Sequence, residues 1–259
     1  MDLGLKNKVF IITGGGAGIG EAITLAAALE GAKVVIVGRT DIAGTDIEKQ
    51  LLEKGGEFIF VKTELSNPDE CKRAVETVIS KFGSVDVLVN NAGVNDGVGL
   101  ENGSPEKLIE SMHKNLFHYY YMAHFSLPYL KKSKGNIVNI SSKTADTGQG
   151  GTSGYAAAKG AQNALTREWA VEMLPFGIRV NCVIPAEVYT PLYERWIKTF
   201  PNSEEKLKQI TSKIPLEQRF TTAEEIANMV IFLASHKSAH TTGQIVYVDG
   251  GYTHLDRAL

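Results

Sequence analysis

A tyrosine and a lysine stand four residues apart in the segment SGYAAAKG, residues 153–160. Positions i and i+4 lie on the same face of an α-helix, and the three alanines between them favour the helix without adding bulk. The Tyr155 phenol and the Lys159 ammonium would then face one cleft and exchange a proton with a bound molecule. The same small residues would also suit a helix that only packs closely against a neighbour, so this segment alone leaves both interpretations open.

A glycine-rich turn, TGGGAGIG at residues 13–20, is a second candidate for chemistry. Gly14 would make a tight turn, Gly18 would let a pyrophosphate approach the backbone, and Gly20 would let a helix pack against a sheet. Backbone N–H groups and the positive end of a helix dipole bind phosphate. Because the turn follows an apolar strand-like segment and opens a helical one, it predicts a dinucleotide site.

The next apolar segment, VVIVGRT, indicates which nicotinamide cofactor is bound. An acidic residue at its end would bind the ribose hydroxyls of NAD. Gly38 stands at that position and Arg39 follows, and a guanidinium can pair with the 2′-phosphate of NADP. Asp41 lies close by, and Arg39 could instead stack on adenine. The sequence therefore favours NADP and keeps NAD as an alternative.

The elements that would position these residues alternate along the chain. Short apolar segments without polar alternation predict strands buried on both faces of a parallel sheet, at 8–13, 33–37, 57–62, 85–90, 136–141, 178–184 and 244–250. Helical periodicity predicts helices at 19–32, 41–55, 68–83, 104–133, 153–174 and 222–235.

Repeated strand–helix–strand units predict an α/β fold: a doubly wound, seven-stranded parallel sheet of the Rossmann type with helices on both faces. Ligands of such sheets bind at the carboxyl ends of the strands. The 259 residues are expected to form a single dinucleotide-binding domain, residues 1–259, and residues 186–221 an insertion that covers the substrate.

Composition narrows the class of partner. The formal net charge is −2 with no run of lysines or arginines, which argues against nucleic acid and anionic membranes. The N-terminal segment fits neither a signal peptide nor a membrane span. Cys71 and Cys182 are far apart and suit packed thiols of a cytoplasmic protein. His236 and His240 lack an acidic or cysteine neighbour, so they predict exposed histidines and no metal site.

Five segments together resemble the short-chain dehydrogenase/reductase family in order and spacing: TGGGAGIG, NNAG at 90–93, ISS at 140–142, YAAAK at 155–159 and IPAEVYT at 184–190. The resemblance extends from residue 8 to residue 251. It implies an NAD(P)-dependent oxidoreductase that transfers hydride between the nicotinamide and a carbinol or carbonyl carbon, with a catalytic tetrad of Asn115, Ser142, Tyr155 and Lys159.

Within that tetrad, the resemblance makes Tyr155 the acid/base and Lys159 the residue that lowers the pKa of the phenol and binds the nicotinamide ribose. Ser142, thirteen residues before the tyrosine, matches the serine that hydrogen-bonds the substrate oxygen. Ser141 is then a packing or turn residue. Asn115 resembles the asparagine that holds a water in the proton relay.

The resemblance also implies the cofactor contacts. Glu64 and Leu65 replace the family's usual Asp-Val at the adenine. Pro185-Ala186 replaces Pro-Gly before the loop that meets the carboxamide, so a different course is expected there. The expected cofactor-binding set is Gly14, Gly18, Ile19, Gly20, Arg39, Glu64, Leu65, Asn90, Ala92, Gly93, Tyr155, Lys159, Val188 and Thr190. Helices 104–133 and 153–174 resemble the family's dimer-forming pair and imply a homotetramer.

The substrate is predicted from the loops. Residues 95–104 and 143–154 are polar, which favours a small polyhydroxy compound over a steroid or a fatty acyl chain. The segments PAEVYTPLYERW and DGGYTHLDRAL resemble the L-fucose dehydrogenase branch of the family, which oxidises the anomeric carbon of a hexose to a lactone. The candidate substrate contacts are Ser142, Lys143, Gln149, Tyr155, Glu187 and Trp196.

Each outer contact has a plainer interpretation. Lys143 and Gln149 could be solvated loop residues, Glu187 a hydrogen bond within its loop, and Trp196 packing of the insertion. An alternative enzyme with the same Ser–Tyr–Lys chemistry is a carbonyl reductase of a 3-oxoacyl thioester or a hydroxysteroid. A non-catalytic dinucleotide sensor is a third hypothesis, and the intact Tyr155 and Lys159 argue against it.

Overall fold

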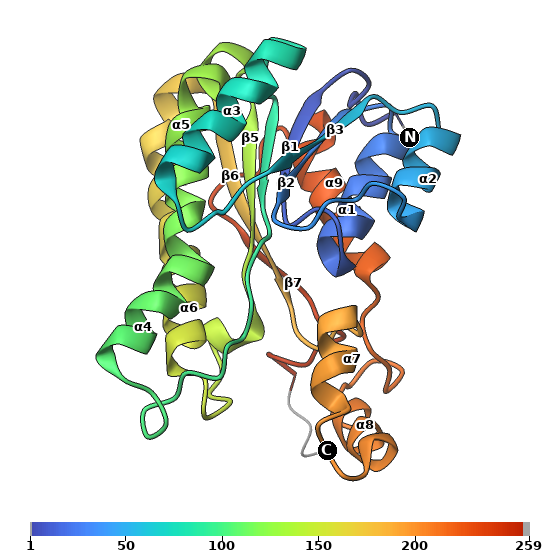
Figure 1. Cartoon of the computed structure of the whole chain (residues 1–259), viewed down its shortest axis with the longest axis vertical. Coiled ribbons are helices and arrows are strands. Elements are labelled where there is room, and N and C mark those ends of the chain that lie inside the picture. The colour runs from blue at the N-terminus through green and yellow to red at the C-terminus, as the bar shows by residue number, and fades with distance from the viewer. Residues whose placement is uncertain (1, 256–259) are drawn as a thin grey trace.

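The computed structural model describes residues 2–255. Met1 and residues 256–259, the end of the segment DGGYTHLDRAL, lie outside the described residues. The strands form one parallel sheet in the order β3-β2-β1-β4-β5-β6-β7, shown in Figure 1, which confirms the predicted doubly wound fold. Their bounds are β1 Val9–Thr13, β2 Lys33–Gly38, β3 Phe58–Lys62, β4 Val87–Asn90, β5 Asn136–Ile140, β6 Arg179–Pro185 and β7 Ile245–Val248.

Helices connect these strands on both faces of the sheet (Figure 1). Their bounds are α1 Gly18–Leu29, α2 Asp46–Glu53, α3 Pro68–Phe82, α4 Pro105–Met112, α5 His118–Ser133, α6 Ser153–Met173, α7 Pro191–Ile197, α8 Ser203–Thr211 and α9 Ala223–Ala234. A π-helical turn, His113–Phe117, joins α4 to α5. Short 3₁₀ turns cover Lys143–Ala145, Leu174–Phe176 and His236–Ser238.

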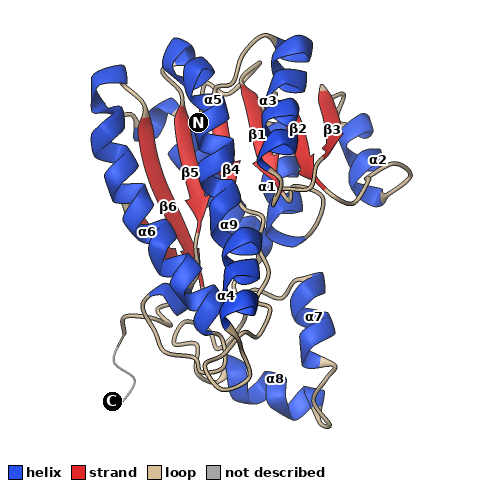
Figure 2. Cartoon of the chain, turned by 60° about the vertical axis from the view of Figure 1, so that its left-hand side comes forward, coloured by secondary structure: helices blue, strands red, loops and turns tan. Residues whose placement is uncertain are grey.

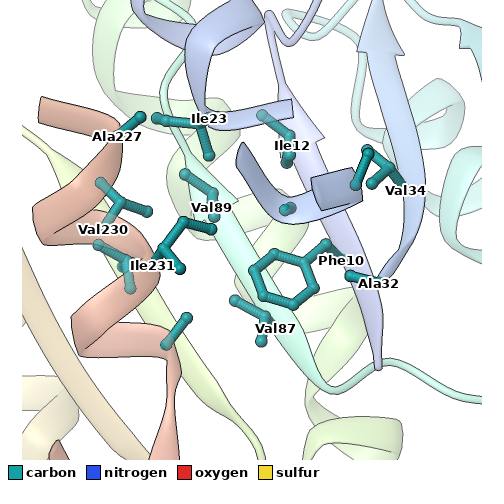
Figure 3. Close-up of a cluster of buried hydrophobic side chains, with 14 of the residues drawn as sticks. Phe10, Ile12, Ile23, Ala32, Val34, Val87, Val89, Ala227, Val230 and Ile231 are labelled. Atoms are coloured by element: carbon teal, nitrogen blue, oxygen red, sulfur yellow. The ribbon is translucent and has the colours of Figure 1, made fainter. Parts of the chain in front are cut away.

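The sheet is buried on both faces, which explains why its strands lack polar alternation. Side chains of β1 alternate between two cores. Phe10 and Ile12 pack with α1, α2 and α9, and Figure 3 shows this cluster between β1, β4, α1 and α9. Val9 and Ile11 pack with α3, α5 and α6. The two cores hold the strand ends, and therefore the loops after them, in fixed positions.

The second predicted helix begins later than expected. The prediction covered residues 41–55, whereas α2 begins at Asp46. The Asp41 carboxylate accepts a hydrogen bond from the Ala43 N–H at 3.0 Å, and Gly44 has a φ of +74°. Such a side-chain turn followed by a left-handed glycine competes with a helix, so residues 41–45 form a loop beside the glycine turn.

The long helix predicted at 104–133 is interrupted by the π turn. The Asn115 side-chain amide donates to the Ser111 carbonyl at 3.1 Å. In an uninterrupted α-helix that carbonyl would pair with the Asn115 backbone N–H. A side chain that enters the hydrogen-bond ladder in this way favours a π turn, and such turns occur often at functional sites.

Residues 186–221 leave the α/β pattern and carry α7 and α8. Figures 1 and 2 show these helices beyond the end of the sheet, on the side where α4 also lies. The Thr221 N–H donates to the Glu187 carbonyl at 3.0 Å, and Val188 pairs with Thr221 in an isolated β-bridge. The two ends of the segment therefore meet.

No helix within residues 2–255 is long and apolar enough to cross a membrane.

Candidate active site

A cavity of about 760 Å³ opens at the carboxyl ends of the strands. Its walls come from the residues that follow β1 to β6 and from α6 and α7, as expected for the switch point of a doubly wound sheet. The predicted site residues that line it are Gly14, Gly18, Ile19, Gly20, Arg39, Glu64, Leu65, Ala92, Gly93, Ser142, Tyr155, Lys159, Val188 and Thr190. The predicted residues outside its lining are Asn90, Asn115, Lys143, Gln149, Glu187 and Trp196.

The glycine turn is shaped to receive a pyrophosphate. A Cβ on Gly20 would lie 2.1 Å from the Gly14 carbonyl oxygen, so only glycine lets α1 start this close to the turn. The N-cap residue Ala17 gives no side-chain hydrogen bond to the first N–H groups of α1. Uncapped N–H groups at a helix N-terminus attract phosphate. These residues fit the diphosphate of NAD(P).

The end of the cavity beyond β2 is lined by the cation Arg39 and the carboxylate Glu64, and Asp41 lies close by in the sequence. Arg39 is largely exposed, with a guanidinium nitrogen 3.9 Å from a Glu64 carboxylate oxygen. Asp41 turns its carboxylate to the Ala43 N–H of its own loop. The guanidinium therefore has one loose, exposed ion pair, which a phosphate can replace.

Ser142 and Tyr155 meet at the other end of the cavity. Ser142 follows β5 and caps the 3₁₀ turn through the Thr144 N–H at 3.3 Å. Tyr155 lies in the first turn of α6. Burial raises the pKa of the Tyr155 phenol to about 12, and a hydrogen bond with Ser142 offsets only part of that rise. The serine that the sequence predicts as the substrate contact thus lies beside the predicted acid/base.

Lys159 is fully buried below Tyr155. Its ammonium donates to the carbonyl of Ile140 at 2.8 Å, to the amide oxygen of Gln162 at 3.1 Å and to the hydroxyl of Tyr119 at 3.4 Å. Its nitrogen lies 5.4 Å from the centre of the Tyr155 ring. Burial lowers the pKa of Lys159 to about 7. In this arrangement burial, rather than the ammonium, sets the pKa of Tyr155.

Asn115 is fully buried in the π turn, behind the cavity wall. Its side-chain oxygen accepts the Val94 N–H at 2.7 Å, and its backbone carbonyl accepts a hydrogen bond from Gln162. A Cβ on Gly93 would lie 3.1 Å from the Asn115 side-chain oxygen. The asparagine thus ties the π turn to the loop after β4.

Asn90 lies outside the cavity lining, whereas Ser141 is part of it. Asn90 is buried and donates to the Asn139 side-chain oxygen at 3.1 Å, so it joins β4 to β5. Its neighbour Asn91 lines the cavity instead. The Ser141 hydroxyl donates to the Lys159 backbone carbonyl at 3.1 Å, which joins β5 to α6.

The outer substrate candidates surround the catalytic end without lining it. Lys143 and Glu187 form an ion pair with each other, and each follows a cavity-lining residue, Ser142 or Ala186. Gln149 is exposed. Trp196 is 43% exposed and packs edge-on against Tyr193 and Phe200, the packing interpretation offered for it above.

Sequence reasoning missed several residues of the site. Gln162 and Tyr119 hold the Lys159 ammonium, and His118 and Asn91 line the cavity. One available signal was the buried polar stripe on α6, where Lys159, Gln162 and Thr166 recur at helical spacing. Polar side chains on a buried helix face need specific partners.

Known proteins resemble this chain along nearly its whole length. The sequence profile described as enoyl-(acyl carrier protein) reductase matches residues 14–253. A 3-oxoacyl-[acyl-carrier-protein] reductase of Thermotoga maritima is 37% identical, over 95% of this chain and 98% of the relative. An L-fucose dehydrogenase of Bos taurus is 34% identical, over 94% of this chain and 88% of the relative.

Solved structures agree with the fold. The Cj0485 dehydrogenase is 50% identical with a TM-score of 0.96, over 100% of this chain and 99% of the other. The aldohexose dehydrogenase of Thermoplasma acidophilum is 32% identical with a TM-score of 0.90, over the same shares of both chains. Reductases of acyl thioesters and dehydrogenases of sugars are thus similar to this chain to a comparable degree.

Proposed function

The chain belongs to the short-chain dehydrogenase/reductase family of NAD(P)-dependent oxidoreductases, and we propose that it oxidises the anomeric carbon of a hexose such as L-fucose to the lactone. We further propose NADP as its preferred cofactor. Sugar dehydrogenases among the similar proteins support the substrate class. The observation that carries the proposal is the largely buried Lys143–Glu187 ion pair, whose two residues directly follow the cavity-lining residues Ser142 and Ala186.

The chain's own residues supply the cofactor site. The N-terminus of α1 would hold the pyrophosphate, Arg39 the 2′-phosphate, and Thr190 and Val188 the carboxamide end. When bound, NAD(P)⁺ supplies the carbon that accepts a hydride. Gly18 and Thr190 approach closely, since a Cβ on Gly18 would lie 3.3 Å from the Thr190 Cβ. The glycine turn and the start of α7 are therefore close neighbours, as expected if they hold the adjoining pyrophosphate and nicotinamide parts of one ligand.

Proton transfer is the task of Ser142, Tyr155 and Lys159. A hemiacetal C–H leaves as hydride only as its O–H proton departs, so a base must reach that oxygen. In this proposal Ser142 hydrogen-bonds the hydroxyl oxygen. Tyr155, a neutral phenol near pH 7, takes the hydroxyl proton as its own proton passes toward the neutral form of Lys159. Lys159 lies next along the path, and its pKa near neutrality lets it exchange that proton onward.

The Lys143–Glu187 ion pair beside the cavity supports a sugar substrate rather than an acyl chain. The side chains of Lys143 and Glu187 are 10% and 13% exposed, so the pair is nearly removed from solvent directly beside Ser142. Desolvated charged groups retain lone pairs and N–H donors that ring hydroxyls can satisfy. We propose that residues 186–221, with α7 and α8, cover this substrate. An aliphatic chain at the same place would offer this ion pair no further hydrogen bonds.

Initial rates with a substrate panel test the function. Purified enzyme is assayed with NADP⁺ and NAD⁺ on L-fucose, its stereoisomers and other aldohexoses, and with NADPH on 3-oxoacyl thioesters and a ketosteroid. We expect the highest kcat/KM with an aldohexose. The acyl carrier protein reductase that is 37% identical to this chain makes thioester reduction the rival function. Turnover of thioesters alone would overturn the sugar assignment and leave the family unaffected.

The assembly and location follow from exposed and buried groups. We propose a homotetramer, because α5 and α6 with the turn after α6 expose large apolar side chains: Tyr120, Val171, Leu174 and Phe176. The free thiols Cys71 and Cys182 are buried, which suits a cytoplasmic enzyme. Light scattering coupled to size exclusion checks the mass, and a monomer would contradict the proposed assembly.

A further inference from the structure

Gln162 connects two members of the predicted tetrad. It lies on α6, one helical turn after Lys159, and its side chain is fully buried. Its amide oxygen accepts a hydrogen bond from the Lys159 ammonium at 3.1 Å. Its amide N–H donates to the backbone carbonyl of Asn115 in the π turn. A single side chain therefore bridges α6 and the π turn.

The chemistry of the two partners fixes the orientation of this amide. An ammonium can only donate and a backbone carbonyl can only accept. The amide oxygen must therefore face Lys159 and the NH₂ group must face Asn115, because the flipped amide would lose both bonds. The bridge has one direction, and it presents the negative end of a dipole to the ammonium.

Within residues 2–255, the hydrogen bonds of the Lys159 ammonium go to three protein acceptors. Its three N–H groups meet the Ile140 carbonyl, the Gln162 oxygen and the Tyr119 hydroxyl. The Tyr119 contact, at 3.4 Å, is the longest. Loss of the Gln162 oxygen would leave a fully buried charged group with an unmatched donor, which costs free energy only while the lysine is protonated.

No carboxylate stands among the titratable groups that the structure places around this lysine within residues 2–255. Those groups are Tyr155 on its own helix, Tyr119 and His118 on α5, and Cys182 on β6. Burial lowers the pKa of Lys159 to about 7. Neutral oxygen acceptors, and not an ion pair, therefore hold the positive charge.

We infer that Gln162 is a positioning residue of the proton-transfer site, which ties the Lys159 ammonium to the π turn at Asn115 and favours the protonated lysine. An amide cannot pass a proton on as a water or hydroxyl does, so the bridge holds the ammonium and does not extend the relay. The inference concerns the chain without substrate, and it stands whichever alcohol the proposed function concerns.

Two substitutions of Gln162 are expected to shift the pKa of Lys159 in opposite directions. Gln162→Glu places a carboxylate at the ammonium and is expected to raise the Lys159 pKa. Gln162→Leu has a similar volume and removes the acceptor, so it is expected to lower that pKa further. The readout is the ¹³C chemical shift of the lysine side chain during a pH titration of the unliganded protein, assigned by the signal lost in Lys159→Met.

The pH profile of kcat/KM should shift in the same directions. Substitution of a residue that orients a catalytic group typically costs about 10- to 100-fold in activity, and we expect Gln162→Leu to lower kcat by that factor. The matched control is Asn163→Leu, because Asn163 is a buried amide on the same helix whose NH₂ group donates to Asp146 instead. Its oxygen accepts from the Cys182 thiol at 3.7 Å, and burial raises the pKa of that thiol to about 12, so the thiol is neutral with or without this contact. That control should lower the melting temperature without shifting the ¹³C titration of Lys159 or the pH profile of kcat/KM.

Opposite shifts in the two Gln162 variants, with none in Asn163→Leu, would support the inference. Unchanged lysine titrations in Gln162→Glu and Gln162→Leu would overturn it, even if activity fell, because a purely structural role lowers activity without moving the titration. If Gln162→Leu fails to fold, Gln162→Glu alone decides the outcome. Failure of the sugar panel would leave these titrations unaffected.

Discussion

The same physical cause shifts the pKa values of Tyr155 and Lys159, the two titratable groups of the proposed catalytic end, in opposite directions. Burial disfavours the charged form of each, so it raises the pKa of the phenol to about 12 and lowers that of the ammonium to about 7. The neutral pair is therefore the form that the protein favours just above neutral pH. The lysine, rather than the tyrosine, is the group whose protonation changes in the physiological range.

This ordering predicts a pH dependence. Alcohol oxidation releases a proton, which in this proposal passes by way of Tyr155 to Lys159. Oxidation therefore requires the unprotonated form of that lysine. We expect kcat/KM for oxidation to rise with pH through an apparent pKa near 7 and then to level off, and kcat/KM for reduction to fall over the same range. Initial rates in constant-ionic-strength buffers measure this. A profile that is flat through pH 7 would contradict the assignment of Lys159.

Removal of the phenol hydroxyl tests the acid/base directly. Tyr155→Phe keeps the ring and its packing but cannot take a proton. General acid–base groups contribute about 10²- to 10⁴-fold, so kcat is expected to fall by that factor. The dissociation constant for NADP⁺, measured by protein fluorescence, should change little. Full turnover in this variant would remove Tyr155 from the mechanism while leaving the fold unaffected.

At the scale of elements, the turn between β1 and α1 depends on close backbone approach. A Cβ on Gly20 would lie 2.1 Å from the Gly14 carbonyl oxygen, whereas one on Gly160, a glycine of α6, would have its nearest neighbour at 3.9 Å. We expect Gly20→Ala to lower both the melting temperature and cofactor affinity, because α1 must move away from the phosphate site.

The matched control for this element is Gly160→Ala. Alanine favours a helix over glycine by about 1 kcal/mol, and the site has room for it, so this variant should be as stable as the native protein or slightly more so. Calorimetry and cofactor titration on both variants make the comparison. Equal behaviour of the two variants would show that close approach at Gly20 does not shape the turn.

The strands and several helix ends could be predicted from the sequence, whereas the π turn could not. The seven strands and the glycine stops of α1, α2 and α3 follow from apolar runs and from residues such as Gly83, which has a φ of +76°. The π turn did not follow, because HKNLF continues the helical pattern. The side-chain hydrogen bond from Asn115 to the Ser111 carbonyl favours the turn, and hydrophobic periodicity does not reveal such a bond.

At the scale of the whole molecule, the sheet order brings together residues that are distant in the sequence. The strand order reverses between β1 and β4, and this opens the crevice that the glycine turn, Ser142 and α6 share. Motif spacing therefore indicated many of the residues that line the cavity, but it included Asn90, which lies outside the lining, and missed Asn91 and His118. It did not indicate that Lys143 and Glu187, 44 residues apart, pair with each other, because tertiary folding alone brings them together.

We propose that charge at the far end of that crevice sets the cofactor preference. Arg39→Ala removes the cation that would pair with a 2′-phosphate, and a charged hydrogen bond of this kind is worth about 10- to 100-fold in binding. We expect that loss in kcat/KM for NADP⁺ and little change for NAD⁺. Glu64→Gln, which frees the same guanidinium from its 3.9 Å ion pair, should move the preference the other way. Equal losses of kcat/KM for both cofactors in Arg39→Ala would contradict a role of Arg39 in binding the 2′-phosphate.

Hydride transfer from the anomeric carbon of a sugar is the central step of the proposed function. The most direct measurement uses L-fucose deuterated at C1 with NADP⁺, followed by mass spectrometry of the reduced cofactor and NMR of the sugar product. We predict that the deuterium appears in the reduced cofactor and that the lactone forms in equal amount. Deuterium that stays in the sugar, with no lactone and no reduced cofactor from L-fucose or any other aldohexose, would contradict the account.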